Sequence, residues 1–245
     1  MALFGTDGIR GSAGSADSLL NPNLVNAIGV ASGIVFQEQA QILIGRDTRK
    51  SGLEIERALI AGLTSVGVNV TLIGVIPTPG LAHLVLTRKA DAAIMITASH
   101  NPASDNGIKI FGSNGQKIAD EIEQEIEQLI ENKSRVKISK EGSVVKDENG
   151  RNDYITYLLS TISKPLNGIT VVVDCAHGSA STYAPEVLKR AGSEVIVIGA
   201  SPDGENINKG CGSTHLDLLA EKVLQSGADL GIAHDGDADR AQIEG

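Results

Sequence analysis

The sequence has few aromatic residues and few cysteines. Its 245 residues include no tryptophan, three phenylalanines, three tyrosines and two cysteines. The hydrophobic core must therefore be built largely from aliphatic side chains, since so few large rings are available. Cys175 and Cys211 are too few for the disulfide framework of a secreted domain, which favours a reducing, cytoplasmic location.

The sequence also lacks a long apolar run. Its most apolar stretch, residues 59–86, is interrupted by Asn69, Pro77, Pro79 and several glycines, whereas a membrane-spanning helix needs about 20 consecutive apolar residues. The first residues show neither the basic segment nor the apolar segment of a secretory signal. We therefore predict that the protein does not bind to a membrane.

Basic residues are in the minority. The chain has 21 Lys and Arg against 30 Asp and Glu, a net charge of −9. This acidity argues against nucleic acid as a partner, because phosphate backbones bind clustered cations. A small phosphorylated ligand needs only a few local donors and stays compatible with the composition. Glycine is abundant, at 28 residues, which indicates many tight loops.

Short apolar runs alternate with segments of helical periodicity, and this alternation predicts an α/β fold with parallel strands covered on both faces. The predicted strands are 41–45, 70–73 and 93–97 in the first half, and 170–174, 194–198 and 229–233 in the second. The predicted helices are 23–37, one opened by a capping box at 51–54, 120–131, 154–162, 182–191 and 214–226. Each half is expected to be a strand–helix–strand–helix–strand unit, so the halves are expected to be structural repeats.

Residues 131–153 differ in character from their surroundings. They are polar and charged, with one short pair of valines. We interpret this segment as the connection between two domains, residues 1–150 and 151–245. Each domain is predicted to be a mostly parallel sheet flanked by helices.

Three aspartates follow the last predicted strand of the second half, where open parallel sheets bind their ligands. Asp235, Asp237 and Asp239 alternate with small residues, so an extended backbone directs all three carboxylates to one side. Such close carboxylates repel one another, and a hard cation neutralises them. Mg²⁺ is favoured because it takes few protein ligands and completes its shell with water and phosphate oxygens. Arg240 beside them suggests a phosphate in the same site.

A serine and a histidine follow the corresponding strand of the first half. Ser99 and His100 are adjacent, so their side chains diverge in an extended segment and a hydrolase pair is poorly supported. Ser99 could instead accept a phosphoryl group. Residues 101–107 are interpreted as a rigid, turn-rich loop. Lys109 is a candidate general acid or base, or a phosphate clamp.

Two weaker candidates remain open. The segment 4–11 carries three glycines and Arg10, which could hold an anion, although glycine content alone favours a flexible terminal arm. Arg46 and Arg49 follow the first strand and are expected to face the same edge of the sheet. Two cysteine–histidine pairs, Cys175 with His177 and Cys211 with His215, offer an alternative zinc site, but their spacings match no common zinc module.

Four motifs, in order along the chain, are similar to those of the α-D-phosphohexomutase superfamily. They are FGTDGIRG at 4–11, GRDTR-x-SG at 45–52, TASHNP-x-x-DNGIK at 97–109 and DGDADR at 235–240. Two further segments, VIPTPG at 75–80 and the run 202–215, resemble the phosphoglucosamine mutase branch. The resemblance covers essentially the whole chain and implies two successive domains of the superfamily's type.

The resemblance also implies roles for residues. Ser99 would carry the phosphoryl group, and Mg²⁺ would bind one oxygen of that phosphoserine together with the three aspartates, Asp235, Asp237 and Asp239. The implied phosphate ligands are Arg10, Lys109 and Arg240, and the implied acid/base residues are His100 and Lys109. The reaction would convert glucosamine 6-phosphate into glucosamine 1-phosphate through glucosamine 1,6-bisphosphate.

Some points stay open. Superfamily members are longer, so the resemblance implies an N-terminal two-domain half that is inactive or weakly active without the C-terminal half of the same protein; a homodimer also stays open. His177, His234 and Ala238 depart from the usual residues of the branch without removing an expected ligand. The alternatives are a phosphomannomutase or phosphoglucomutase, and a non-catalytic Mg²⁺-dependent module that binds phosphosugars.

Overall fold

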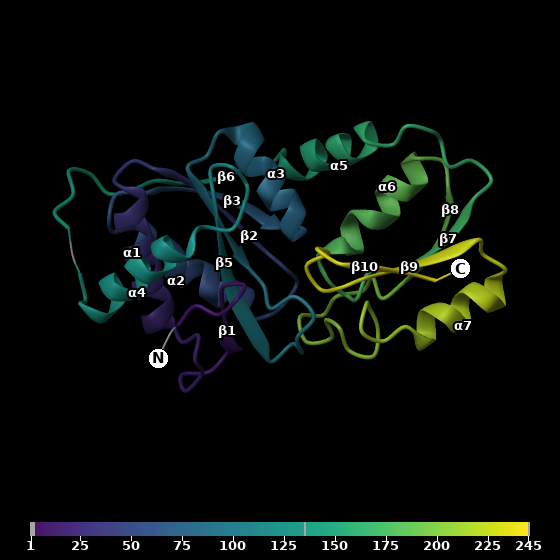
Figure 1. Ribbon diagram of the computed structural model, residues 1–245, viewed down its shortest axis with the longest axis horizontal. Helices are drawn as coiled ribbons and strands as arrows, with labels where there is room; N and C mark the ends of the chain where they lie inside the picture. The colour runs from purple at the N-terminus through teal and green to yellow at the C-terminus, as the bar shows by residue number, and fades with distance from the viewer. Residues whose placement is uncertain (1–2, 135, 245) are drawn as a thin grey trace.

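Two sheets lie side by side along the longest axis of the computed structural model, which describes residues 3–134 and 136–244 (Figure 1). The first sheet has the strand order β1-β5-β4-β2-β3-β6. Its strands are β1 (Ile9–Ser12), β2 (Gln41–Arg46), β3 (Asn69–Val75), β4 (Ala92–Ile96), β5 (Asp105–Gly112) and β6 (Val144–Lys146). Parallel pairing joins β4, β2, β3 and β6, whereas β5 and β1 are antiparallel.

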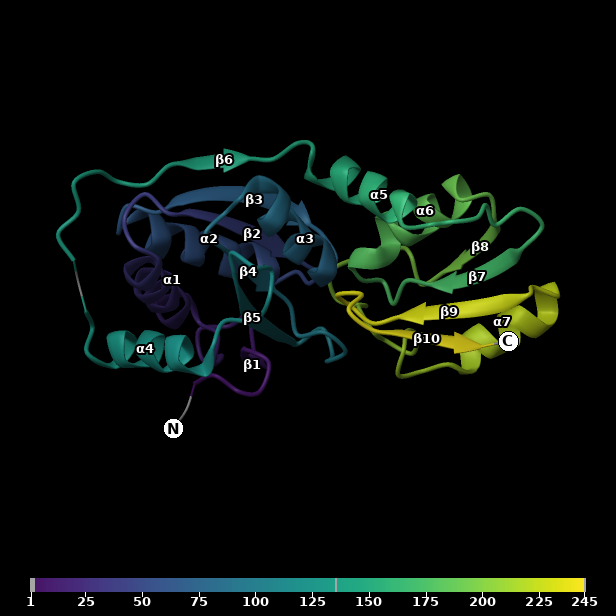
Figure 2. The same cartoon turned by 45° about the horizontal axis from the view of Figure 1, so that its top comes forward.

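Alternate residues of β2 face two separate hydrophobic clusters, because successive side chains of a strand point to opposite faces. Ile42 and Ile44 pack with helices α1 (Pro22–Phe36), α2 (Gly52–Thr64) and α4 (Asp120–Glu131). Leu43 packs on the other face with α3 (Thr78–Arg88) and α5 (Gly150–Ser160). Both faces are therefore covered, as Figure 2 shows, and both clusters are largely aliphatic.

The second sheet has the order β10-β9-β7-β8. Its strands are β7 (Thr170–Asp174), β8 (Glu194–Ile198), β9 (Leu230–His234) and β10 (Ala241–Glu244), with the short helix η1 (Ser179–Thr182) and helices α6 (Ala184–Arg190) and α7 (Asp217–Ser226) on its faces. Within each strand–helix–strand–helix–strand unit the spatial order is third, first, second: β4-β2-β3 in one sheet and β9-β7-β8 in the other. The expected α/β fold with two mostly parallel sheets is thus confirmed, and the structure adds that both units share one internal strand order.

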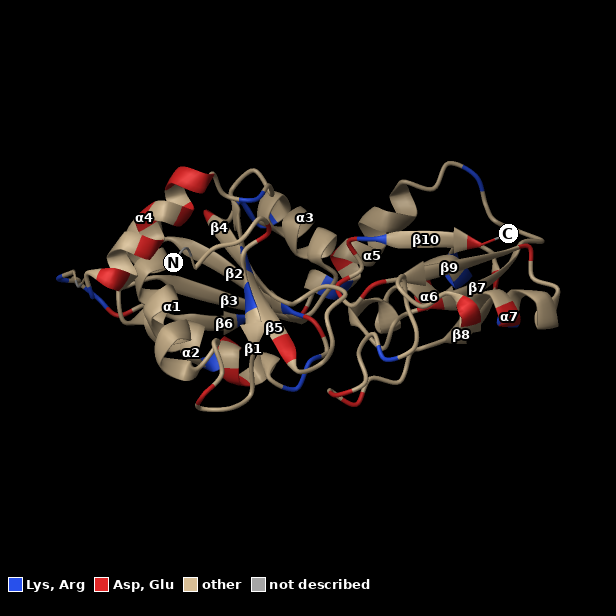
Figure 3. Cartoon of the chain, turned by 60° about the horizontal axis from the view of Figure 1, so that its bottom comes forward, with Lys and Arg blue, Asp and Glu red and all other residues tan. Residues whose placement is uncertain are grey.

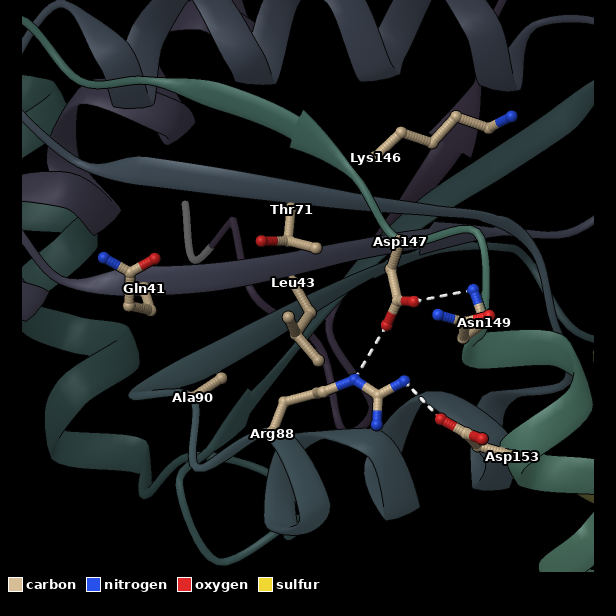
Figure 4. A pocket seen from close by; sticks show the side chains of 9 residues that line it. All are labelled: Gln41, Leu43, Thr71, Arg88, Ala90, Lys146, Asp147, Asn149 and Asp153. Carbon is tan, nitrogen blue, oxygen red and sulfur yellow. Dashed lines mark hydrogen bonds and ion pairs between the residues drawn. The ribbon is translucent and has the colours of Figure 1, made fainter.

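The connection between the sheets is more structured than its polarity suggests. Within residues 131–153, β6 first adds an edge strand to the first sheet, and α5 then begins at Gly150. Arg88 of α3 binds the segment between β6 and α5, as Figure 4 shows. Its Nε donates to Asp147 at 2.8 Å, and its Nη2 donates to Asp153 at 2.5 Å. Asp147 also accepts the backbone N–H of Gly150 at 3.0 Å, so it stabilises the start of α5. The domain division at residue 150 stays a prediction.

Two strands of the first sheet run through segments that the sequence assigns to loops. The terminal arm expected at 4–11 contains the start of β1, and the loop expected at 101–107 ends in β5. Each segment carries a glycine where backbones approach closely, Gly8 in the first and Gly107 in the second. A Cβ on Gly107 would lie 2.4 Å from the carbonyl oxygen of Thr97. The sequence pattern places Gly107 in a turn. In the structure it lies in β5, where the neighbouring backbones leave no room for a Cβ.

Helix starts were also predicted imperfectly. The expected capping box at 51–54 is wrong, because Ser51 Oγ accepts a hydrogen bond from Asn106 Nδ2 at 2.9 Å instead of capping α2. The helices predicted at 182 and 214 begin at Ala184 and Asp217. In the part of the chain that the structure describes, no helix has the length and apolarity to cross a membrane.

We expect Asp147→Ala to lower the free energy of unfolding by about 1 kcal/mol, since it removes a helix-end acceptor and an ion pair. Burial alone would raise the pKa of Asp147, but hydrogen bonds from Arg88 and two backbone N–H groups hold that pKa below its ordinary value of 3.8. The contribution is therefore full above pH 3.8 and fades as the pH falls further. Urea unfolding at several pH values measures it. Lys146→Ala, which removes an exposed pair with Glu148, is the control and should change little.

Candidate active site

The loop that follows β4 and the loop that follows β9 meet where the two sheets adjoin. Ser99 Oγ donates a 2.5 Å hydrogen bond to Asp235 Oδ2, although the two residues are 136 positions apart. Both side chains are fully buried. Figure 3 shows acidic and basic residues gathering at this junction. The carboxyl ends of the parallel strands in the two sheets thus bring together the serine and the aspartates that the sequence singles out.

Ser99 has a backbone conformation that residues other than glycine seldom adopt. Its φ is +54°, in the left-handed region. Its N–H donates to Thr97 Oγ1 at 2.9 Å, and its carbonyl oxygen accepts from Arg49 Nη2 at 3.0 Å and from Asn208 Nδ2 at 2.8 Å. The strained turn is therefore held from both domains.

Arg49 shapes the serine loop from inside the protein. Its side chain is fully buried and pairs with Asp47 at 2.9 Å. Its remaining donors reach four carbonyl oxygens of the loop, those of Ser99, Asn101, Pro102 and Asp105. Arg49 thus lies at the expected edge of the sheet, beside the serine loop, but its donors are occupied by the loop backbone.

The three aspartates form a compact group of oxygen ligands. One carboxylate oxygen from each of Asp235, Asp237 and Asp239 lies within 4.8 Å of the others. Burial and the neighbouring charge of Asp237 raise the pKa of Asp235 to about 7. Asp237 Oδ1 is buried, and no hydrogen-bond partner for it exists among residues 3–134 and 136–244. A free buried carboxylate oxygen and mutually repelling charges fit a divalent cation with oxygen ligands, such as Mg²⁺.

Lys109 reaches the same group from β5. Its Nζ donates to Asp237 Oδ2 at 3.0 Å and to Asp239 Oδ2 at 3.1 Å, and it pairs with Asp7 at 3.2 Å. Burial alone would lower the pKa of Lys109, but the charges of these carboxylates raise it overall. The ammonium form is therefore stabilised, which suits a clamp for anions.

Three further side chains lie around Ser99. His100 Nδ1 is 3.5 Å from Ser99 Oγ and 3.1 Å from Arg240 Nη1. Burial, followed by the charges of Arg240 and Arg10, lowers the pKa of His100, so its imidazole is neutral at pH 7. Arg10 forms an ion pair with Asp7. A neutral imidazole thus lies beside the serine with guanidinium groups close to it, an arrangement that could hold a phosphate and accept a proton.

The sequence did not point to three residues of this site. Thr78 contacts Asp237, Asp7 contacts Lys109, and Asn208 contacts Ser99. The only sequence signal for Thr78 and Asn208 is that their segments resemble those of a known family. The alternative zinc site is not formed. Over the described ranges, the three aspartates are the only group of three or more His, Cys, Asp or Glu side chains with ligand atoms close enough for one ion. His177 Nδ1 instead accepts the N–H of Ser201.

Known protein families match both domains. The family model described as phosphoglucomutase/phosphomannomutase, alpha/beta/alpha domain I, matches residues 1–137. The model of alpha/beta/alpha domain II of the same family matches residues 152–243. The two matches leave only the connection between the domains and the last residues uncovered.

Individual relatives extend the comparison. The phosphoglucosamine mutase of Thermobifida fusca is 48% identical over 247 residues, which cover 98% of this chain and 54% of the relative. A phosphoglucomutase/phosphomannomutase family protein from Burkholderia thailandensis has a TM-score of 0.86 at 27% identity, over 99% of this chain and 54% of that one. A putative phosphomannomutase from Thermus thermophilus has a TM-score of 0.81 at 26% identity, over 98% and 56%. The chain spans about half the length of the relatives it matches.

We expect Asp235→Asn to stabilise the metal-free protein at pH 8 by about 1–3 kcal/mol, because it removes a charge that burial and Asp237 disfavour. The raised pKa means that the folded state holds a proton more tightly than the unfolded state. Wild-type stability should therefore fall as the pH rises from about 4 to about 7, and less so in the variant. Mg²⁺ should raise the melting temperature of the wild type and not that of the variant. Calorimetry in EDTA and in Mg²⁺ measures both effects, with the exposed Asp17→Asn as control.

We expect Arg49→Met to lower the free energy of unfolding by about 3–5 kcal/mol, because it leaves the buried carboxyl of Asp47 and four carbonyl oxygens of the serine loop without their donor. Denaturant unfolding measures the loss. Arg57→Met, on the exposed side of α2, should change stability by less than about 0.5 kcal/mol. Equal effects of the two substitutions would contradict the assigned role of Arg49.

Proposed function

The chain belongs to the phosphoglucomutase/phosphomannomutase family, and on that premise we propose that it supplies the phosphoserine and metal-binding part of a phosphoglucosamine mutase. The observation that carries the proposal is the hydrogen bond between Ser99 Oγ and Asp235 within a group of three aspartates. A serine hydroxyl next to a magnesium-type oxygen site suits phosphoryl transfer, which depends mainly on orientation and charge neutralisation.

The proposed reaction has two transfers. In the first, the 1-hydroxyl of glucosamine 6-phosphate attacks the phosphorus on phosphorylated Ser99; the O1–P bond forms as the Ser99 Oγ–P bond breaks. The hydroxyl proton ends on Ser99 Oγ, and His100 and Lys109 are the candidates to carry it. In the second, the bound glucosamine 1,6-bisphosphate turns around and Ser99 Oγ attacks the phosphorus on O6; the Oγ–P bond forms as the O6–P bond breaks, and the proton of Ser99 ends on O6. The product is glucosamine 1-phosphate, and the phosphoserine is restored.

The charged side chains have separate proposed tasks. Arg10 and Arg240 would hold the phosphate oxygens, since a guanidinium offers paired donors to them. Lys109, stabilised as the ammonium form, would offset the negative charge near Asp237 and Asp239. A Mg²⁺ ion held by Asp235, Asp237, Asp239 and a phosphoserine oxygen would neutralise the charge that develops on the transferred phosphoryl group.

The proposed sugar is an amino sugar. The support is the 48% identity to a phosphoglucosamine mutase, against 26% to a putative phosphomannomutase. The chain corresponds to about half of each relative. Catalytic turnover, formation of a homodimer and association with the remaining domains therefore all belong to the proposal. The reaction of Ser99 with a bisphosphate is therefore the direct test.

We expect purified protein incubated with Mg²⁺ and glucosamine 1,6-bisphosphate to gain one phosphoryl group on Ser99 and to release a glucosamine monophosphate. Intact-mass measurement and peptide mapping detect the first, and chromatography detects the second. Ser99→Ala should gain none, whereas Ser104→Ala, an exposed serine of the same loop, should behave as the wild type.

The choice of bisphosphate separates the alternatives. Faster transfer from glucose or mannose 1,6-bisphosphate would favour a phosphoglucomutase or phosphomannomutase. Binding of all three sugars with Mg²⁺, but without transfer to Ser99, would favour a non-catalytic module. Phosphate found on another residue, and equally in Ser99→Ala, would contradict the proposal.

A further inference from the structure

The segment VIPTPG at 75–80 has no role in the proposed reaction, yet its threonine touches the metal loop of the other domain. Thr78 is the first residue of α3 and is buried. Its hydroxyl donates to Asp237 Oδ2 at 2.6 Å, and its backbone N–H donates to the carbonyl oxygen of Asp237 at 2.9 Å. One residue of the first domain thus holds both the side chain and the backbone of Asp237.

These contacts fall on one oxygen of the carboxylate. Thr78 Oγ1 and Lys109 Nζ both donate to Asp237 Oδ2, at 2.6 Å and 3.0 Å. Asp237 Oδ1 is buried and, throughout the described part of the chain, accepts no hydrogen bond. The two donors therefore fix the rotation of the carboxylate and leave its other oxygen free to bind a cation.

The local sequence fixes where the hydroxyl lies. Pro77 and Pro79 flank Thr78 and restrict the backbone around it, and a proline is well tolerated in the first turn of α3. Gly80 lets the helix approach α5, since a Cβ there would lie 2.8 Å from the ring of Tyr154. The first N–H groups of a helix also favour a negative charge beside them. The segment therefore presents a rigid donor pair to Asp237.

We propose that Thr78 is a positioning residue for the metal ion: its hydroxyl orients Asp237 so that one carboxylate oxygen faces the ion. The inference rests on the proposed metal site. It adds that the cation affinity of a loop in the second domain is set partly by a side chain of the first. Docking of the domains and metal binding are thereby linked, because undocking would remove the donor.

The test is calorimetric titration of the purified protein with Mg²⁺ and with Mn²⁺ alone, without any sugar phosphate. Thr78→Val keeps the shape of the side chain and removes the hydroxyl, so we expect affinity to fall about 10–100-fold. Thr78→Ser keeps the hydroxyl and should retain wild-type affinity. Thr87→Val, on the same helix but hydrogen-bonded only to backbone carbonyls of α3, is the matched control.

The outcomes separate this inference from the proposed function. If the wild type binds neither cation, the metal site itself is refuted. If the wild type binds and Thr78→Val binds equally well, or if Thr78→Ser is as weak as Thr78→Val, the positioning role is overturned. Should Thr78→Val fail to fold by circular dichroism, Thr78→Ala replaces it with the same expectation. Mn²⁺ electron paramagnetic resonance gives an independent measure of bound ion.

Discussion

Repulsion among three carboxylates at the junction of the two domains is the constraint on which the rest of the structure depends. Asp235 and Asp237 are fully buried, and burial together with the charge of Asp237 raises the pKa of Asp235 to about 7. The offsetting groups come largely from the first domain, as the ammonium of Lys109 and the hydroxyl of Thr78. The second domain's loop therefore has its lowest energy only when the first domain is docked against it.

The topology explains why these groups meet. In each sheet the third strand of the repeated unit lies beside the first strand and is followed by an antiparallel strand. The serine loop joins β4 to β5, and the aspartate loop joins β9 to β10, so the two loops occupy the same place in their domains. Two copies of one supersecondary arrangement therefore face each other. The first contributes Ser99 and Lys109, and the second contributes the three aspartates.

Local sequence patterns predict the elements that are determined by the residues within them. The apolar runs at 41–45 and 170–174 became the central parallel strands, and the strand-end rule led to Ser99 and the aspartates. The pattern could not reveal β5, because its Asp-Asn-Gly start has the chemistry of a turn. Nor could it reveal Thr78, whose partner is 159 residues away, since that contact exists only once two domains have docked.

Gly236 lies at the junction of the two domains, where a glycine is needed because a side chain would not fit. A Cβ on Gly236 would lie 2.6 Å from the carbonyl oxygen of Ser99 and 3.0 Å from Asn208 Nδ2. That carbonyl oxygen is the acceptor shared by Arg49 and Asn208, so a side chain at 236 would push the serine loop away from both donors. The loop could then neither keep Ser99 in its left-handed conformation nor hold Ser99 Oγ 2.5 Å from Asp235. Close approach of two backbones is thus what this glycine provides, and the contact between serine and aspartate depends on it.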